Sequence, residues 1–288
     1  MKNLANRLEN LGVERRFALD IGSVVLGIRP RGLLHVPTHL KQDLGLLLRS
    51  YGLRIEASRE LYRRHDSTSR EGVLSEYSSD DSAAEKWDEV WYANPAAAIV
   101  GQTALFINPG KFLGYPKCCR RAMTGKDALA RLYRRYLFEE ADRYWELNRL
   151  AALFHDAILM PDFFPCSMAC ASAQSYVVPF HQVASQVFSE SELADARNAM
   201  LAPMTIIAAE VVQWRNWRCV GDRLCVKSNG ARKESLSRVS SFLPSRDESS
   251  AHLVSFKHLL VAGHEAVPCI LRIEAEGYAM TEIPLRLV

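Results

Sequence analysis

Two cysteine pairs constrain the fold of this chain more than any other feature of its sequence. Cys118 and Cys119 are adjacent, while Cys166 and Cys170 lie further along the chain with three residues between them. A single site for all four thiols requires a fold that brings these distant segments together. Each pair closely follows a proline, so we expect each to follow a turn at the start of a helix. Helix N-termini favour thiolate over thiol because their N–H groups carry a partial positive charge.

The composition is that of an ordinary globular protein. Of the 288 residues, 48% are hydrophobic and 24% are charged, and the formal net charge of +3 does not indicate nucleic acid or an anionic membrane as a partner. The charged, amphipathic start of the chain lacks the apolar core of a signal peptide, and the most apolar stretch, Ala96–Ile107, is too short to span a bilayer. We therefore expect a cytoplasmic protein in which thiols stay reduced. The odd number of cysteines, seven, also favours metal binding or catalysis over a complete set of disulfides.

Hydrophobic periodicity and turn residues predict an α+β protein. The expected helices are Asn3–Leu11, Pro37–Leu48, Ser82–Tyr92, Ala96–Phe106, Lys126–His155 and Gln182–Trp217, the last of them split at Pro203. The expected strands are a β-like run over Phe17–Ile28, a hairpin around Gly221-Asp222 and an alternating segment over Cys269–Glu274. Polar, serine-rich residues 66–82 predict a loop, and residues 228–250 are polar and rich in residues that break helices and strands. We expect a mainly helical body over residues 1–219, which carries the cysteine site, and a smaller β-containing C-terminal region over residues 220–288 packed on it.

Positive charge surrounds the first cysteine pair. Lys117, Arg120 and Arg121 flank the two adjacent thiols, and such surroundings stabilise the thiolate that acts as a metal ligand or nucleophile. The second pair has a four-residue spacing, which puts both thiols on one face if the segment is helical.

Adjacent cysteines narrow the choice of metal. Zinc commonly uses Cys-x2-Cys knuckles, whose spacer residues let both thiolates wrap one ion. Neighbouring side chains diverge, so adjacent cysteines suit two irons of one cluster better than one small ion. The favoured cofactor is an iron–sulfur cluster of the 4Fe-4S type, with zinc as the alternative, and its ligands are Cys118, Cys119, Cys166 and Cys170. A vicinal disulfide at the first pair would close a strained and easily reduced ring.

The two motifs resemble those of a little-characterised prokaryotic family, a domain of unknown function. This family combines Gly-Tyr-Pro-x-Cys-Cys with a later Pro-Cys-x3-Cys, which correspond here to Gly114–Cys119 and Pro165–Cys170. The resemblance covers about residues 95–200. It implies that all four cysteines form one site, and it implies no activity.

In ligand type, the adjacent cysteines are also similar to those of the CCG domain of heterodisulfide reductases. A subunit of respiratory complex I likewise uses adjacent cysteines as cluster ligands. This chain departs from both, since arginine instead of glycine follows Cys119 and the second motif is Cys-x3-Cys.

Two histidines and two arginines are further candidates for the site. His155 ends the longest predicted helix and His181 follows Cys170 by 11 residues, so either is a candidate ligand or acid–base group. Each has a plainer interpretation as well, a helix C-terminal cation for His155 and an ordinary surface residue for His181. Arg120 and Arg121 are candidates for steadying an anionic substrate.

Three cysteines are predicted to lie outside the site. Cys219, Cys225 and Cys269 are isolated in apolar surroundings, and the expected hairpin places Cys219 and Cys225 on opposite faces of a sheet. We interpret all three as core residues. The segment Tyr133–Tyr136 has two interpretations, a surface that contacts an anion or nucleic acid and a helix surface whose tyrosines point toward the core, and the second is favoured.

Three functions remain open from the sequence. The first is an iron–sulfur enzyme that performs sulfur transfer, a lyase step or redox chemistry on a small anionic substrate. Such an enzyme could also have an electron donor or another protein as its partner. The second is a structural zinc protein that binds RNA or a protein partner. The third is a thiol-dependent enzyme in which Cys118 or Cys119 is the nucleophile. Signatures of P-loop, Rossmann, serine-hydrolase, zincin and radical SAM proteins are absent from the sequence.

Overall fold

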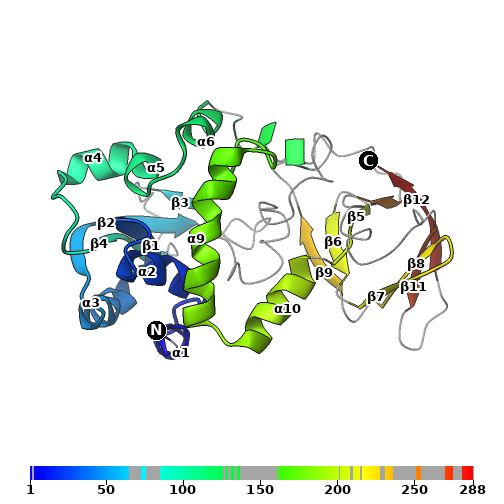
Figure 1. The fold of residues 1–288 in the computed structure, drawn as a ribbon, viewed down its shortest axis with the longest axis horizontal. Helices are drawn as coiled ribbons and strands as arrows, with labels where there is room; N and C mark the ends of the chain where they lie inside the picture. The colour runs from blue at the N-terminus through cyan, green and yellow to red at the C-terminus, as the bar shows by residue number, and fades with distance from the viewer. Residues whose placement is uncertain are drawn as a thin grey trace. The chain divides into compact units, whose positions relative to one another are not determined.

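The structure is a computed structural model that describes residues 1, 3–64, 73–75, 85–125, 128, 131–132, 135–136, 161, 163–200, 202–207, 210–214, 216–227, 231–235, 251–253, 270–274 and 281–287. The helices are α1 Leu4–Asn10, α2 Phe17–Val25, η1 Thr38–Leu40, α3 Lys41–Ser50, α4 Gln102–Ile107, α5 Pro109–Phe112, α6 Lys117–Ala122, α9 Ala171–Val187 and α10 Glu190–Met200. The strands are β1 Arg31–Pro37, β2 Arg54–Arg64, β3 Val73–Ser75, β4 Glu85–Ala93, β5 Met204–Ile207, β6 Glu210–Trp214, β7 Trp217–Val220, β8 Arg223–Lys227, β9 Ala231–Ser235, β10 Ala251–Leu253, β11 Ile270–Glu274 and β12 Thr281–Leu287. The predicted α+β class is confirmed (Figure 1).

The first sheet is antiparallel and has the strand order β1-β4-β2-β3. Strand β4 lies between β1 and β2, and its residues Asp88–Ala93 are all buried. The helix predicted over Ser82–Tyr92 is therefore wrong. The segment contains Val90, Trp91 and Tyr92, and such β-branched and aromatic residues favour a strand when partners on both edges bury them.

Helix α2 corrects the β-like run predicted over Phe17–Ile28. Residues Ala18–Val24 are all buried, so this helix is enclosed on most of its circumference. A short run that is buried on all sides lacks the period that separates helix from strand.

Helix α2 also carries one half of a buried ion pair. The Arg29 Nη2 atom lies 2.5 Å from Asp20 Oδ1, and the two side chains are 3% and 10% exposed. Burial lowers the pKa of Arg29, but the Asp20 carboxylate and nearby tyrosines together raise it well above its ordinary value. The Arg29 guanidinium therefore stays charged although it is buried beside Asp20.

Gly32 in β1 marks a close approach inside the first sheet. It lies opposite Tyr92 in β4, and a Cβ atom at this position would be 2.1 Å from Tyr92 Cζ. Only glycine leaves room for the fully buried tyrosine ring, whose burial raises the pKa of the Tyr92 hydroxyl.

The predicted helices Asn3–Leu11 and Pro37–Leu48 are confirmed as α1 and as η1 with α3. The helix predicted over Ala96–Phe106 begins only at Gln102, as α4. The residues before it form a turn, in which Arg54 donates hydrogen bonds to the carbonyl oxygens of Pro95 at 2.8 Å and Ala97 at 2.6 Å.

The region predicted as helical over Gln182–Trp217 is helical only in its first half. Helix α9 ends at Val187 and helix α10 ends at Met200, and the chain after Pro203 forms strands β5 and β6. These strands are rich in β-branched residues such as Ile206 and Val211, which pair with each other in the sheet.

The second sheet has the strand order β7-β8-β11-β12-β10-β5-β6-β9. Its hairpin at Gly221-Asp222 is confirmed, since Cys219 pairs with Leu224 and Arg218 with Cys225. The predicted alternating segment is confirmed over Ile270–Glu274 as β11. A cluster of buried side chains packs on one face of this sheet, and it consists of Val212, Trp214, Leu224, Val226 and Leu271.

The described residues form two compact units, one around each sheet. The second sheet already includes β5 and β6, which precede residue 220. Strand β3 falls in the predicted loop 66–82, and β9 falls in the polar segment 228–250. The rest of these two segments and most of the predicted helix Lys126–His155 lie outside the described residues. Within the described part of the chain, no helix is long and apolar enough to cross a membrane.

Candidate metal centre

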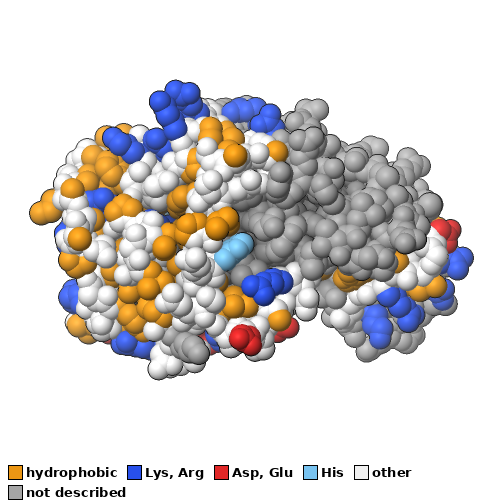
Figure 2. All heavy atoms as spheres, in the orientation of Figure 1, with side chains coloured by type: hydrophobic (Ala, Val, Ile, Leu, Met, Phe, Trp, Pro, Cys, Tyr) orange, Lys and Arg blue, Asp and Glu red, His pale blue; other side chains and the backbone are white. Residues whose placement is uncertain are grey.

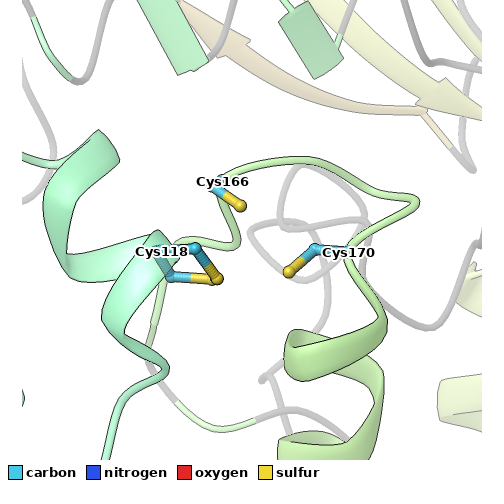
Figure 3. A group of neighbouring side chains, drawn as sticks. Cys118, Cys166 and Cys170 are labelled. Carbon is cyan, nitrogen blue, oxygen red and sulfur yellow. The ribbon is translucent and has the colours of Figure 1, made fainter.

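Four cysteine side chains converge on one point. The Sγ atoms of Cys118, Cys119, Cys166 and Cys170 all lie within 4.8 Å of one another. Figure 3 shows the labelled sulfurs of Cys118, Cys166 and Cys170 directed toward one another from helix α6, a loop and the turn before α9. The two pairs are therefore brought together, as a single site requires.

The first pair lies in the first turn of helix α6, as the preceding proline predicts. Gly114, with φ of 79°, reverses the chain, and Arg120 N donates to Pro116 O at 3.0 Å to begin the helix. The Arg120 Nε atom donates back to Tyr115 O at 3.2 Å, which ties the helix to the turn. The sulfurs of Cys118 and Cys119 are 3.9 Å apart. This distance is well beyond an S–S bond of about 2.05 Å, so the vicinal disulfide is not formed.

The second pair does not lie within a helix, so the expectation of a shared helical face does not apply. Cys166 is in the loop after Pro165, and Cys170 immediately precedes α9. Cys170 N donates to Ser167 O at 3.1 Å, and Gln174 N donates to Cys170 O at 3.0 Å, which is the first hydrogen bond of α9. A tight turn followed by a helix start thus directs both thiols to the same point.

Residues 89–191 match a family model described as a protein of unknown function, DUF483. The family is an uncharacterised domain family. The DUF483 region contains all four cysteines, and the predicted resemblance to such a family is confirmed. No curated protein and no solved structure gives a significant match to the chain.

Two consecutive residues of the DUF483 region hold the loop of the second pair. Arg135 Nη1 donates to Cys166 O at 2.8 Å, and the Tyr136 hydroxyl donates to Pro165 O. Tyr136 is fully buried, as its place in the apolar period predicts. The role of Arg135 was not foreseen, because its sequence shows an ordinary exposed helix position and only the tertiary fold brings the loop to it.

An aromatic cluster includes Tyr115 of the first cysteine motif of the DUF483 region. Its other members are Phe163, Tyr176 and Phe180. Tyr115 precedes Cys118 by three residues, and Phe163 precedes Cys166 by three residues. Their ring centroids are 5.5 Å apart, and each ring also contacts Tyr176 of α9. The cluster therefore fixes the backbone that leads into both cysteine pairs.

Tyr176 anchors this cluster. Its hydroxyl donates to Leu113 O at 3.1 Å, one residue before the Gly-Tyr-Pro turn. Burial raises the pKa of Tyr176, although the nearby Arg29 guanidinium opposes this shift.

The four cysteines of the DUF483 region differ in their access to solvent. Cys118 is exposed and Cys119 is 1% exposed, while Cys166 and Cys170 are half-buried. Lys117 and Arg121 are exposed on the same short helix, and Arg120 is half-buried with its guanidinium on Tyr115 O. Figure 2 shows basic side chains gathered over the part of the molecule where Figure 1 places α4 to α6.

Of the two candidate histidines, the structure describes His181 alone, and His181 is not part of the four-cysteine group. His181 is exposed within α9, and its separation from Cys170 corresponds to about 16 Å along a helix at 1.5 Å per residue. His155 lies outside the described residues. Their assignment as ligands or acid–base groups stays a prediction, as does the assignment of Arg120 and Arg121 to a substrate.

Cys219 and Cys225 lie in the second sheet and are not part of the four-cysteine group. Cys219 packs against the cluster that contains Leu224. Cys225, on the other strand of the hairpin, is buried but is not a member of that cluster. Burial, with a smaller contribution from Cys225, raises the pKa of the Cys219 thiol. Cys225 is buried, as the sequence predicts, whereas Cys219 is only half-buried. Cys269 lies outside the described residues.

Proposed function

We propose that this protein binds a single metal ion, zinc in the first place, through the thiolates of Cys118, Cys119, Cys166 and Cys170. The observation that carries the proposal is the spacing of the four sulfurs, all within 4.8 Å of one another. Zn–S bonds of about 2.3 Å in a tetrahedron place neighbouring sulfurs about 3.8 Å apart. The 3.9 Å between the sulfurs of Cys118 and Cys119 agrees with that spacing.

This spacing favours one ion over the iron–sulfur cluster that the adjacent cysteines suggest. In a cluster each thiolate binds a different iron, and the irons and inorganic sulfides separate the ligands further than one ion does. The divergence of neighbouring side chains, which argues against one ion, is overcome here because the two sulfurs of the pair lie only 3.9 Å apart.

The charge around the site supports a thiolate-bound cation. Four thiolates around a divalent ion leave a net negative charge. Lys117 and Arg121 on α6 supply positive charge, and so does Arg135, which holds the loop of Cys166. We place the protein in a reducing compartment, the cytoplasm, because thiolate ligands must not be oxidised.

The ion would clamp two segments that are far apart in the sequence. Among the described residues, the aromatic cluster and the hydrogen bonds of Arg135 and Tyr136 also hold these segments. Closing a long loop with a metal restricts the unfolded chain and stabilises the fold. In this role the protein is a zinc-clamped binding protein, and RNA or another protein is the partner class it would serve.

The second candidate is an iron–sulfur enzyme, with a 4Fe-4S cluster acting on a small anionic substrate. The observation that favours it is the exposure of Cys118 beside two exposed cations, since an open edge of a cluster would admit such a substrate. The third candidate, a metal-free thiol enzyme with Cys118 or Cys119 as nucleophile, is compatible with the same exposure.

One purification separates the three candidates. The protein is isolated without oxygen and assayed for zinc, iron and labile sulfide per chain, and its visible spectrum is recorded. One zinc per chain in a colourless protein, and thiolate-to-cobalt absorption after replacement by Co²⁺, is the result expected for a single-ion site. Iron with sulfide and a brown colour would establish the second candidate instead, and a protein without metal would overturn both metal proposals.

A further inference from the structure

The four cysteines of the site are not equivalent, because only one of them is exposed. Cys119 is 1% exposed, and Cys166 and Cys170 are half-buried in the turn before α9. Cys118 is the position at which a molecule in solution can approach the sulfur cluster.

The surface around Cys118 is positively charged. Lys117 and Arg121 are both exposed, and Arg121 follows Cys118 by three residues on α6, which puts the two side chains on the same helix face. Arg120 is half-buried, and its Nε atom donates a hydrogen bond to Tyr115 O at 3.2 Å, so it contributes less to this exposed surface. A small anion that approaches Cys118 therefore meets two cations.

We propose that the metal-bound thiolate of Cys118 is a nucleophile that accepts an alkyl group from a donor with a negatively charged group. This inference rests on the proposed metal site, because Cys118 supplies one of the four converging sulfurs that would hold the ion. Lys117 and Arg121 bind the charged group of the donor and so place its electrophilic carbon next to Cys118 Sγ. Cys119, Cys166 and Cys170 hold the ion and are shielded from the donor.

The step is a simple displacement that needs no oxidant or reductant. A lone pair on Cys118 Sγ forms an S–C bond, while the bond between that carbon and its leaving group breaks and the leaving group departs with the electron pair. The product is a thioether at position 118. A thioether is neutral, so each transfer removes one negative charge from the site. A thioether is also a weaker ligand than a thiolate.

The test compares two alkylating probes of similar size and different charge, iodoacetate and iodoacetamide. The full chain is used with its metal content measured, less than one equivalent of probe is added, and the modified residue is identified by peptide mass spectrometry. We expect Cys118 to be modified first by both probes. Cys219, a half-buried thiol outside the group, is the internal reference and reacts more slowly because burial raises its pKa.

The charge requirement has its own variant. In the double variant Lys117→Gln/Arg121→Gln, the ratio of the iodoacetate rate to the iodoacetamide rate at Cys118 should fall roughly three- to tenfold, since two nearby cations are lost. The matched control removes two other exposed cations of the DUF483 region, Lys111→Gln/Arg131→Gln, and should leave the ratio unchanged.

The outcomes are distinct for the two proposals. A chain that binds no metal overturns the proposed function and with it this inference. A chain that binds one metal ion but is alkylated first at Cys166, Cys170 or Cys219, or whose rate ratio is the same in the Lys117/Arg121 variant, keeps the metal site and overturns the role of Cys118.

Discussion

Arg135 donates a hydrogen bond from Nη1 to the carbonyl oxygen of Cys166 at 2.8 Å. The neighbouring Tyr136 hydroxyl donates to the carbonyl oxygen of Pro165, so two consecutive side chains hold the backbone at the start of the second cysteine pair. A metal site depends on such supports because they fix the ligands before the ion arrives.

Replacement of Arg135 should weaken metal binding without abolishing it. We expect Arg135→Ala to lower the affinity about tenfold, since the loop of Cys166 loses the hydrogen bond that Arg135 donates to it. Competition with a chromophoric chelator measures this change. Arg131→Ala is the matched control, because Arg131 Nη2 donates to a different carbonyl, that of Thr124, at 3.1 Å. Equal affinities of the two variants would contradict a positioning role for Arg135.

The buried members of the site and of the second sheet offer a second matched pair. Cys119 and Cys225 are 1% and 5% exposed, but only Cys119 is part of the four-cysteine group. We expect Cys119→Ser to lose most of its bound metal and to melt at a lower temperature, because metal binding and folding are coupled. Cys225→Ser should retain the metal of the natural chain even if it is less stable. Metal analysis and thermal unfolding of both variants measure these effects, and equal metal content would count against Cys119 as a ligand.

The ion pair of Asp20 and Arg29 should be costly to break from one side. Asp20→Ala leaves a buried guanidinium without its carboxylate, and we expect the free energy of unfolding to fall by about 3–5 kcal/mol. The double variant Asp20→Ala/Arg29→Met should recover part of this loss, because no charge stays buried. Urea unfolding measures both. Glu14→Ala is the control, since the Glu14 side chain is 59% exposed in its pair with Arg16 and its loss should cost less than about 1 kcal/mol. A single variant no less stable than this control would show that the buried pair is dispensable.

Stability should decline above pH 10 in a way that involves Tyr176. Burial raises the pKa of Tyr176 in the folded chain above the ordinary value of 10.0, so the unfolded chain loses this proton first. As the pH rises above that value, the unfolded state is favoured and the free energy of unfolding falls. Tyr176→Phe removes the titrating group together with its hydrogen bond to Leu113 O. The variant should therefore be less stable by about 1 kcal/mol at neutral pH but show a shallower decline between pH 9 and pH 11 in denaturant unfolding. Parallel declines would exclude Tyr176 as a source of the pH dependence.

Local features of the fold were readable from the sequence. The helix at Lys41–Ser50 and the hairpin at Gly221-Asp222 are set by residues within one turn of each other, so pattern and turn chemistry predict them. The start of α6 after Pro116 belongs to the same class, because the turn and the helix start are local. The predicted elements that were wrong, Phe17–Ile28 and Ser82–Tyr92, depend on what covers them. A buried apolar run becomes helix α2 or strand β4 according to its neighbours in space.

The sequence by itself identified the four cysteines that come together in one site. Two motifs introduced by proline set Cys118, Cys119, Cys166 and Cys170 apart from Cys219 and Cys225, which lie in the second sheet. Only the tertiary structure decided the spacing of the four sulfurs, all within 4.8 Å of one another, and the exposure of Cys118 against the burial of Cys119. The physical reason is that residue type and local turns set the chemistry and direction of each thiol. The distance between thiols of distant segments depends instead on the aromatic packing and the hydrogen bonds of Arg135 and Tyr136, which form only when the chain has folded.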